Sequence, residues 1–281
     1  MSRSRGGRAS RMCLIVLAWR QREDAPLLLA ANRDEFHARP SAAADFWTDE
    51  PGVLAGRDLR AGGTWLGLGR GGRFATITNI RDPDGGSAAG RRSRGELVTQ
   101  FLTSGDAPEP FLRSVAARVH DYQGFNLLLS DGGSLWYLHG VTGAAPRRLA
   151  PGLYGLSNAT LDVPWPKVCR ARRELDAILH DPQPPGHRAL AACLASRAVA
   201  SESELHGHGL VGAMAQPLSA QFIVTPTYGT RCCTTLRWLA DGRRELREES
   251  FDAGGHCIAT REFALPPGSD WPAAPGPGAQ H

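Results

Sequence analysis

The chain has 281 residues, of which 42% are hydrophobic and 21% are charged, so it can bury a substantial core and is too apolar for a disordered protein. Its formal net charge of +4 is spread along the sequence, without the dense basic stripe of a nucleic-acid-binding protein. No apolar stretch reaches the roughly 18 residues that a transmembrane helix needs, and the six cysteines include no CxxC pair for zinc or thiol redox chemistry. We therefore expect a cytoplasmic globular protein without a nucleic-acid partner, a transmembrane segment or a metal site.

The first part of the chain predicts strands. Residues 1–11 are basic and small, and we expect them to be a disordered extension or a mis-assigned start. Two nearly continuous apolar runs follow at 13–19 and 26–32, and their lack of polar alternation predicts central strands that are covered on both faces. A hairpin is expected over 64–79, where two short apolar runs flank a glycine-rich turn.

The rest of the chain predicts two pairs of helices separated by further strands. The capping-box residues Ser93 and Glu96 mark the start of the first helix. The expected elements, in order, are helices at 93–102 and 110–120, a hairpin over 124–140, helices at 165–180 and 187–199, and strands at 221–226, 230–239 and 244–252.

This order of strands, helix pair, strands, helix pair and strands predicts an α+β fold. Two mainly antiparallel sheets, stacked face to face and each covered on its outer face by a helix pair, satisfy the order. We therefore predict a four-layer α-β-β-α sandwich formed by a single domain over residues 12–265. The residues 266–281 are rich in proline and glycine and should form a flexible tail.

Cys13 begins the first predicted strand and directly follows Met12. If synthesis starts at Met12 and this residue is removed, the α-amine of Cys13 has an ordinary pKa of about 7.7–8.0 and can act as a general base at neutral pH. One residue would then supply both the nucleophilic thiol and its base. The alternative is that Cys13 is one more buried structural thiol.

Asp34 is the predicted partner of that amine. It lies in the sequence Asn32-Arg33-Asp34-Glu35 at the end of the second strand, and antiparallel pairing would bring this end beside the start of the first strand. Asp34 could then accept a hydrogen bond from the α-ammonium group of Cys13. The alternative is a charge cluster that faces solvent or pairs within itself.

Two asparagines and several basic or aromatic residues complete the predicted site. Asn79 and Asn158 each end a short strand, where a side-chain amide can donate to the oxygen of a tetrahedral intermediate; turn formation is the alternative role. Arg231 could clamp a carboxylate or phosphate of a ligand, or form a surface ion pair. The predicted substrate-binding residues are Asn32, Arg33, Arg57, Trp65, Arg81 and Arg231.

An ordered set of motifs carries a family resemblance. The motifs are Met12-Cys13, Asn32-Arg33-Asp34-Glu35, AGRD with GGTWLG, the Thr-Asn pair at 78–79, SRGELV, GFNL, GLSN with PWPK, and YGTR. In this order they resemble the NRDE family, also called the transport and Golgi organisation protein 2 family, from Met12 to about residue 250. The family begins at the Met-Cys pair, which implies that residues 1–11 are absent from the working protein.

The NRDE family is similar to a branch of the N-terminal nucleophile (Ntn) hydrolases, and that fold agrees with the predicted layer order. The resemblance implies that Cys13 is the nucleophile, that Asp34 orients its amine, and that Asn79 and Asn158 form the oxyanion hole. The chain departs from the related cysteine amidases at Ala31, because those enzymes carry an arginine three residues before the aspartate.

Three functions follow as expectations. The first is an amidohydrolase in which Cys13 cleaves the C–N amide bond of a small acylated substrate without a cofactor. The second is a carrier, because the resemblance also points to haem trafficking and to lipid or acyl-CoA metabolism. Under this second function, Cys13, His37 and His139 are the possible haem ligands. The third is a scaffold that binds no small ligand.

Overall fold

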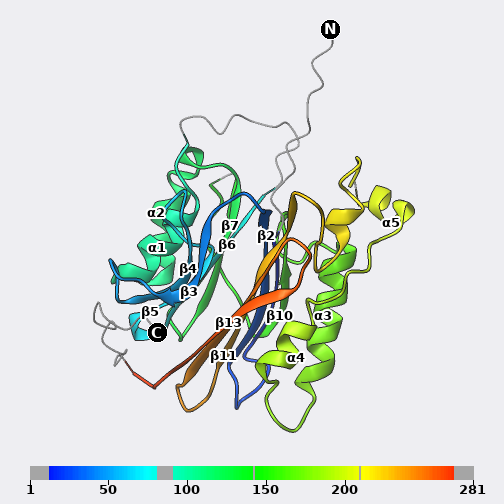
Figure 1. The fold of residues 1–281 in the computed structure, drawn as a ribbon. Helices are drawn as coiled ribbons and strands as arrows, with labels where there is room; N and C mark the ends of the chain where they lie inside the picture. The colour runs from blue at the N-terminus through cyan, green and yellow to red at the C-terminus, as the bar shows by residue number, and fades with distance from the viewer. Residues whose placement is uncertain (1–12, 81–90, 142, 209, 269–281) are drawn as a thin grey trace.

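The computed structural model describes residues 13–80, 91–141, 143–208 and 210–268, which form two stacked β-sheets with helices on the outside (Figure 1). The first sheet has six antiparallel strands in the order β10-β1-β2-β11-β12-β13. Both predicted central strands, β1 and β2, have a neighbour on each side. The bounds are β1 Cys13–Trp19, β2 Leu27–Phe36, β10 Gly152–Leu156, β11 Tyr228–Trp238, β12 Arg244–Phe251 and β13 Cys257–Leu265.

The second sheet has seven antiparallel strands, β3 to β9, which follow one another in chain order. Both predicted hairpins are present in it, one as β5 and β6 and the other as β7 and β8. The bounds are β3 Ser41–Phe46, β4 Val53–Asp58, β5 Leu66–Gly69, β6 Arg73–Asn79, β7 Phe125–Ser130, β8 Leu135–Gly140 and β9 Arg147–Arg148.

Each sheet carries a helix pair on its outer face. The helices α1 (Gly95–Thr103) and α2 (Pro108–Ala116) contact the second sheet, whereas α3 (Pro166–Leu179) and α4 (His187–Ala192) contact the first (Figure 1). The described residues thus form four layers, which confirms the predicted α-β-β-α sandwich. The remaining short helices are η1 Arg70–Gly72, η2 Val119–Asp121, α5 Glu202–Gly207 and η3 Pro217–Ser219.

The strand β1 shows why its sequence is apolar at nearly every position. Leu14 and Val16 point toward α3 and belong to the core between the first sheet and its helices. Ile15 and Leu17 point the other way and belong to the core between the two sheets. Because successive side chains of a strand face opposite sides, a strand that is buried on both faces needs a continuous apolar run.

The predicted capping box at the start of α1 is wrong. The N-cap residue is Arg94, whose side chain makes no capping hydrogen bond. Glu96 instead accepts a hydrogen bond from the Tyr122 hydroxyl at 2.7 Å and pairs with Arg92. A capping box does occur at α5, where Ser201 and Glu204 satisfy each other's backbone nitrogens.

Two elements of the last third also differ from the prediction. The helix predicted over 187–199 ends at Ala192. The segment 221–226 is not a strand and forms only one isolated bridge, between Val224 and Gly229. It bonds to the start of β11 without a regular ladder, because the nitrogen of Ile223 donates to the Thr230 hydroxyl while its carbonyl oxygen accepts from the Thr230 nitrogen.

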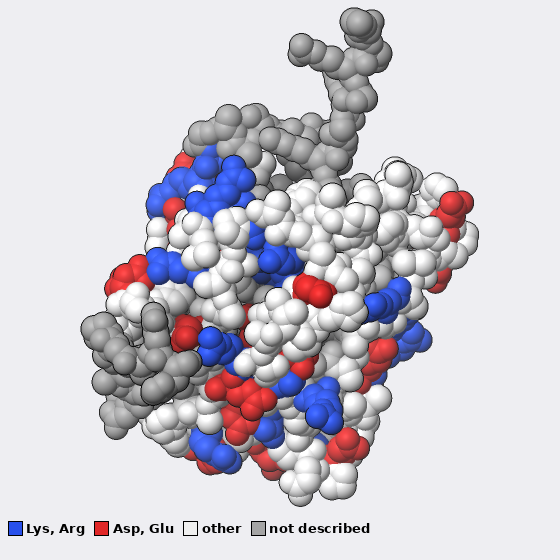
Figure 2. All heavy atoms as spheres, in the orientation of Figure 1, with Lys and Arg blue, Asp and Glu red and all other residues white. Residues whose placement is uncertain are grey.

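Residues 1–11, Arg81 and residues 269–281 lie outside the described residues, so the predictions made for them stay predictions. Within the described ranges, no helix is both long enough and apolar enough to cross a lipid bilayer. On the face drawn in Figure 2, acidic and basic side chains are interspersed over the lower half of the molecule.

Candidate active site

Cys13 occupies the first position of β1. It pairs with Arg33 of β2, so the end of the second strand lies beside the start of the first, as expected. By strand alternation its side chain shares the face of Ile15, which belongs to the core between the sheets, whereas Cys13 itself is half-buried. Burial raises the pKa of the Cys13 thiol to about 11, and the nearby charge of Asp34 adds to the rise. The thiol is therefore protonated at neutral pH and needs a base before it can attack a carbonyl carbon.

Asn158 fastens the main chain around Cys13. Its Oδ1 accepts a hydrogen bond from the backbone nitrogen of Cys13 at 3.0 Å, and its Nδ2 donates to the carbonyl oxygen of Asn79 at 2.7 Å. The hydroxyl of Ser157 donates to the carbonyl oxygen of Cys13 at 2.7 Å. These bonds join the start of β1, the end of β6 and the turn after β10, so three of the four predicted catalytic residues are in contact.

Asp34, the fourth, is a buried carboxylate next to Cys13. The residue is 1% exposed, and its charge acts on the Cys13 thiol. Its Oδ1 accepts a hydrogen bond from Thr230 Oγ1 at 2.7 Å, whereas its Oδ2 is shut off from solvent and has no hydrogen-bond partner among the described residues. Burial raises the pKa of Asp34 to about 7, against the opposing effects of Lys167, Thr230 and Arg33.

The Asn-Arg-Asp-Glu sequence does not form one cluster, because successive side chains of β2 point to opposite faces. Asn32 points to the helix side, where its Nδ2 donates to the carbonyl oxygens of Leu194 at 3.0 Å and Gln221 at 2.9 Å. It therefore ties β2 to the segments that cover this face of the first sheet. Arg33 lies on the opposite face, which it shares with the Cys13 side chain.

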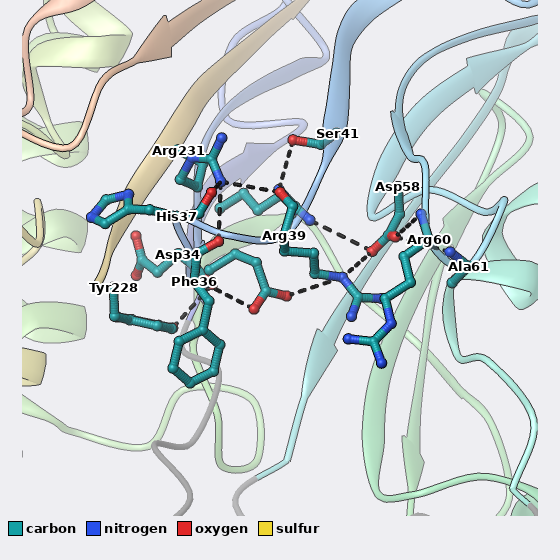
Figure 3. A network of polar contacts seen from close by, with 12 residues as sticks. Asp34, Phe36, His37, Arg39, Ser41, Asp58, Arg60, Ala61, Tyr228 and Arg231 are labelled. Carbon is teal, nitrogen blue, oxygen red and sulfur yellow. Dashed lines mark hydrogen bonds and ion pairs between the residues drawn. The ribbon is translucent and has the colours of Figure 1, made fainter. Parts of the chain in front are cut away.

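A network of charged side chains lies around Arg39 and Asp58 of β4 (Figure 3). The Arg33 guanidinium stacks on the ring of Trp65 at 4.2 Å and lies 3.6 Å from Asp58 Oδ2. Arg39 Nε lies 2.6 Å from the same oxygen and 3.6 Å from Glu35. Burial tends to raise the pKa of Asp58, but the hydrogen bond from Arg39 and the other neighbours outweigh it, and the pKa is lowered. This ionised carboxylate pairs with Arg33, which lies opposite Cys13 in the strand pairing and stacks on Trp65.

Two further arginines predicted to bind substrate contact the protein itself. Arg57 forms two hydrogen bonds of 2.6 Å with Asp49 and stacks on Trp47 at 4.1 Å. Arg231 holds the turn between β2 and β3, because its Nη1 donates to the carbonyl oxygens of Phe36, His37 and Arg39 (Figure 3). Both guanidinium groups therefore have structural partners.

Two of the three predicted haem ligands, His37 and His139, have polar contacts within the protein. His37 Nε2 lies 3.0 Å from the carbonyl oxygen of Thr225, and His139 Nδ1 lies 3.2 Å from Asn126 Oδ1. Neither histidine lines the groove of about 320 Å³ on the described surface near Phe222, and Cys13 does not line it either. The described residues also contain no group of three or more His, Cys, Asp or Glu side chains that could hold a metal ion.

Comparison with known proteins identifies the family of the chain. A family model described as Transport and Golgi organisation 2 matches residues 12–253. The chain belongs to the Transport and Golgi organisation 2 family. The family's homologue in Bos taurus is 38% identical over 257 residues, which cover 85% of this chain and 92% of the relative. The homologue in Homo sapiens is 36% identical over the same length and the same shares. These matches confirm the family resemblance drawn from the motifs.

Among solved structures, the chain is similar to the Caenorhabditis elegans N-acylethanolamine-hydrolyzing acid amidase ortholog. The two are 9% identical with a TM-score of 0.36, over 80% of this chain and 92% of that chain.

Sequence reasoning missed two buried residues near the site, Asn126 and Lys167. Asn126 Nδ2 donates to Thr78 Oγ1 at 3.0 Å and to the carbonyl oxygen of Ala159 at 2.7 Å, so it holds the turn that carries Asn158. The sequence feature that could have indicated Asn126 was its side-chain amide at the start of the apolar run FNLLL. Lys167 is the only lysine of the chain, and its position within the PWPK motif was the corresponding signal.

Asp34 is expected to make the stability of the protein depend on pH. Its pKa of about 7 in the folded chain exceeds its ordinary value of about 4, so the folded chain binds more protons than the unfolded chain between these values. Stability is therefore highest, as far as Asp34 contributes, below about pH 4 and falls as pH rises to about 7. We expect Asp34→Asn, which keeps the shape and the Thr230 contact, to reduce this fall by a few kcal/mol. Urea unfolding of both proteins at pH 5 and pH 8 measures the difference, and equal pH dependence would contradict the expectation.

Proposed function

We propose that the protein is a cysteine hydrolase of the N-terminal nucleophile type, which cleaves the C–N amide bond of a small acylated substrate once Cys13 is the first residue. The observation that supports this best is the position of the Cys13 nitrogen. It donates a hydrogen bond to Asn158 Oδ1 at 3.0 Å, and Cys13 pairs across the strands with Arg33, the residue before the buried Asp34. When no peptide precedes it, this nitrogen is an amine whose N–H group can donate to the Asn158 amide oxygen.

The proposed reaction begins when the Cys13 thiol passes its proton to its own α-amine. Because the thiol pKa of about 11 lies above the ordinary pKa of an α-amine, about 8, the ionised Asp34 assists by stabilising the α-ammonium group. The thiolate then attacks the amide carbonyl carbon and forms a C–S bond, while the amides of Asn158 and Asn79 donate to the oxyanion. The α-ammonium returns the proton to the leaving nitrogen as the C–N bond breaks. Water then hydrolyses the thioester and restores the thiol.

Arg33 and Trp65 are the proposed substrate contacts. Arg33 pairs with Cys13 across β1 and β2 and faces the space between the sheets, where Trp65 supports its guanidinium. A guanidinium that pairs with Cys13 across the strands and stacks on an aromatic ring supports the binding of an acylated substrate with a polar or anionic group.

The proposal is tested by trapping the acyl-enzyme. Protein that begins at Cys13 is mixed with a panel of acyl p-nitroanilides of increasing chain length and quenched in acid. We expect release of p-nitroaniline, and intact and peptide masses that place the acyl group on Cys13. If these amides bind, as calorimetry would show, but yield neither p-nitroaniline nor an adduct, the hydrolase proposal is contradicted and a carrier of acyl ligands becomes the better description.

A further inference from the structure

The groove near Phe222, with a volume of about 320 Å³, has the lining of a ligand site. Its walls are mostly apolar and come from Val199, Pro217, Ala220, Phe222 and Val224. Pockets that hold small ligands are mostly apolar, with a few polar groups that orient the ligand, and enclose roughly 300–1,000 Å³. The volume of the groove lies at the lower end of this range and therefore suits a small molecule.

Arg197 places a cation against these apolar walls. Its guanidinium carbon lies 5.2 Å from the centroid of the Phe222 ring, and its Nη2 donates to the carbonyl oxygen of Gly255 at 3.0 Å. A Cβ atom added to Gly255 would lie 2.8 Å from both Arg197 Nη2 and Val224 Cγ2, and 2.9 Å from Phe222 Cε1. The guanidinium and the two apolar side chains thus meet around the same glycine.

The charge of Arg197 has no acidic partner among the described residues. Asp252, in the same turn as Gly255, accepts hydrogen bonds from the backbone nitrogens of Gly254 and His256, each at 2.9 Å. A guanidinium has five N–H donors, and a carboxylate is the anion that its planar geometry fits best in an organic ligand. Gln216 also lines the groove and adds a side-chain amide that can donate.

The apolar walls of the groove are open to water. Val199 is 46% exposed and Val224 is 39% exposed, and two more exposed apolar residues, Val211 and Met214, shortly precede Gln216 in the chain. Exposed apolar surface that is grouped in this way often marks a binding groove, and covering it is favourable. The groove therefore complements a ligand that has both an apolar body and a negative charge.

The Phe222 wall of the groove is separate from the candidate active site. The residue before Phe222, Gln221, accepts a hydrogen bond from Asn32 Nδ2 at 2.9 Å through its carbonyl oxygen. This contact lies on the helix side of β2, whereas the Cys13 side chain shares the opposite face with Arg33. The first sheet thus lies between this wall and the Cys13 thiol.

We propose that the groove is a binding site for a small carboxylic acid with a compact apolar body. The carboxylate accepts hydrogen bonds from Arg197 and Gln216, and the apolar body covers Val199, Phe222 and Val224. The site does not depend on the proposed hydrolase function, because none of these residues takes part in that reaction.

The charge preference is tested by titration calorimetry of the full chain at pH 7.5 with two matched probes, phenylacetate and the neutral phenylacetamide. We expect one saturable site for phenylacetate and at least about tenfold weaker binding of phenylacetamide, because hydrogen bonds between charged groups contribute more than those of neutral groups. Equal affinities for the two probes, or no saturable binding of phenylacetate, would overturn the proposal.

The location is tested with variants of exposed residues. Arg197→Gln removes the cation and Val199→Asp adds a repelling charge, and we expect each to weaken phenylacetate binding at least about tenfold. Val141→Asp is the matched control, because Val141 is a valine of similar exposure, 49%, that does not line the groove. It should bind like the wild type. Wild-type affinity in both Arg197→Gln and Val199→Asp would rule out this groove.

A further variant separates this proposal from the hydrolase proposal, since phenylacetate could also occupy the candidate active site. Arg33→Gln changes a proposed substrate contact and should leave phenylacetate binding unchanged. Binding that is lost in Arg33→Gln but kept in Arg197→Gln would assign the acid to the active site and overturn the groove. If the wild-type protein forms no acyl-enzyme but binds phenylacetate through Arg197, the hydrolase proposal fails and the groove stands. Circular dichroism melts show whether each variant is folded, and the two probes decide the charge preference on the wild type alone.

Discussion

Protein that begins at Cys13 is expected to hydrolyse acyl p-nitroanilides about 100- to 10,000-fold faster than protein that keeps residues 1–12. The range is the usual contribution of a general base, and the longer form has none at this position, because an amide nitrogen does not accept a proton at neutral pH. The thiol cannot ionise alone to a useful extent, since its pKa is about 11. The measurement is kcat/KM for both forms at pH 7.5, with each N-terminus established by intact mass.

Two variants of the protein that begins at Cys13 test whether its activity depends on the Cys13 thiol. Cys13→Ala with a free N-terminus keeps the amine and removes the thiol, and we expect no acyl-enzyme from it. Cys257→Ala is the matched control, because Cys257 is an exposed free cysteine on β13, and its kcat/KM should equal that of the wild type. Equal activity in the long and short forms would contradict a role for the α-amine and would move the base to another group.

The fold followed from local patterns to a large extent. The run at 13–19 is apolar at odd and even positions alike. Only a strand that is covered on both faces fits this pattern, and β1 is such a strand. The same reasoning did not find β3, whose sequence SAAADF is short and lies partly at the surface. The same reasoning predicted a strand over 221–226. The sequence could not show that the nitrogen of Ile223 donates to the Thr230 side chain and takes no part in a regular ladder.

The parts of the site that depend on the pairing of neighbouring strands could be predicted from the sequence. The contacts between side chains of different layers could not. The antiparallel pairing of β1 and β2 brought Cys13 beside Arg33, as the chain order suggested. The direction of each side chain was harder, because Asn32 reaches the segments over the first sheet while Arg33 faces the second sheet. Asn158 reaches the backbone nitrogen of Cys13 from a turn more than a hundred residues later, and no local pattern encodes such a contact.

Asn158→Ala is expected to lower kcat at least about 100-fold, which is the usual effect of losing one oxyanion donor. The loss should be larger than for a donor that acts alone, since Asn158 also holds the backbone nitrogen of Cys13 and the carbonyl of Asn79. Leaving these buried groups without a partner should also lower the free energy of unfolding by about 1–3 kcal/mol. Steady-state kinetics and urea unfolding on the same preparation measure both effects.

Asn126→Ala is the matched control, because it separates the chemical effect from the structural one. Asn126 is a buried amide of the same region that bonds to Thr78 and Ala159 but makes no contact with Cys13 among the hydrogen bonds of the described residues. Asn126→Ala should therefore lower the free energy of unfolding by about 1–3 kcal/mol, as Asn158→Ala should, with a much smaller loss of kcat. Equal losses of kcat in the two variants would reduce Asn158 to a scaffold residue, since a donor to the oxyanion must affect the rate beyond its effect on the fold.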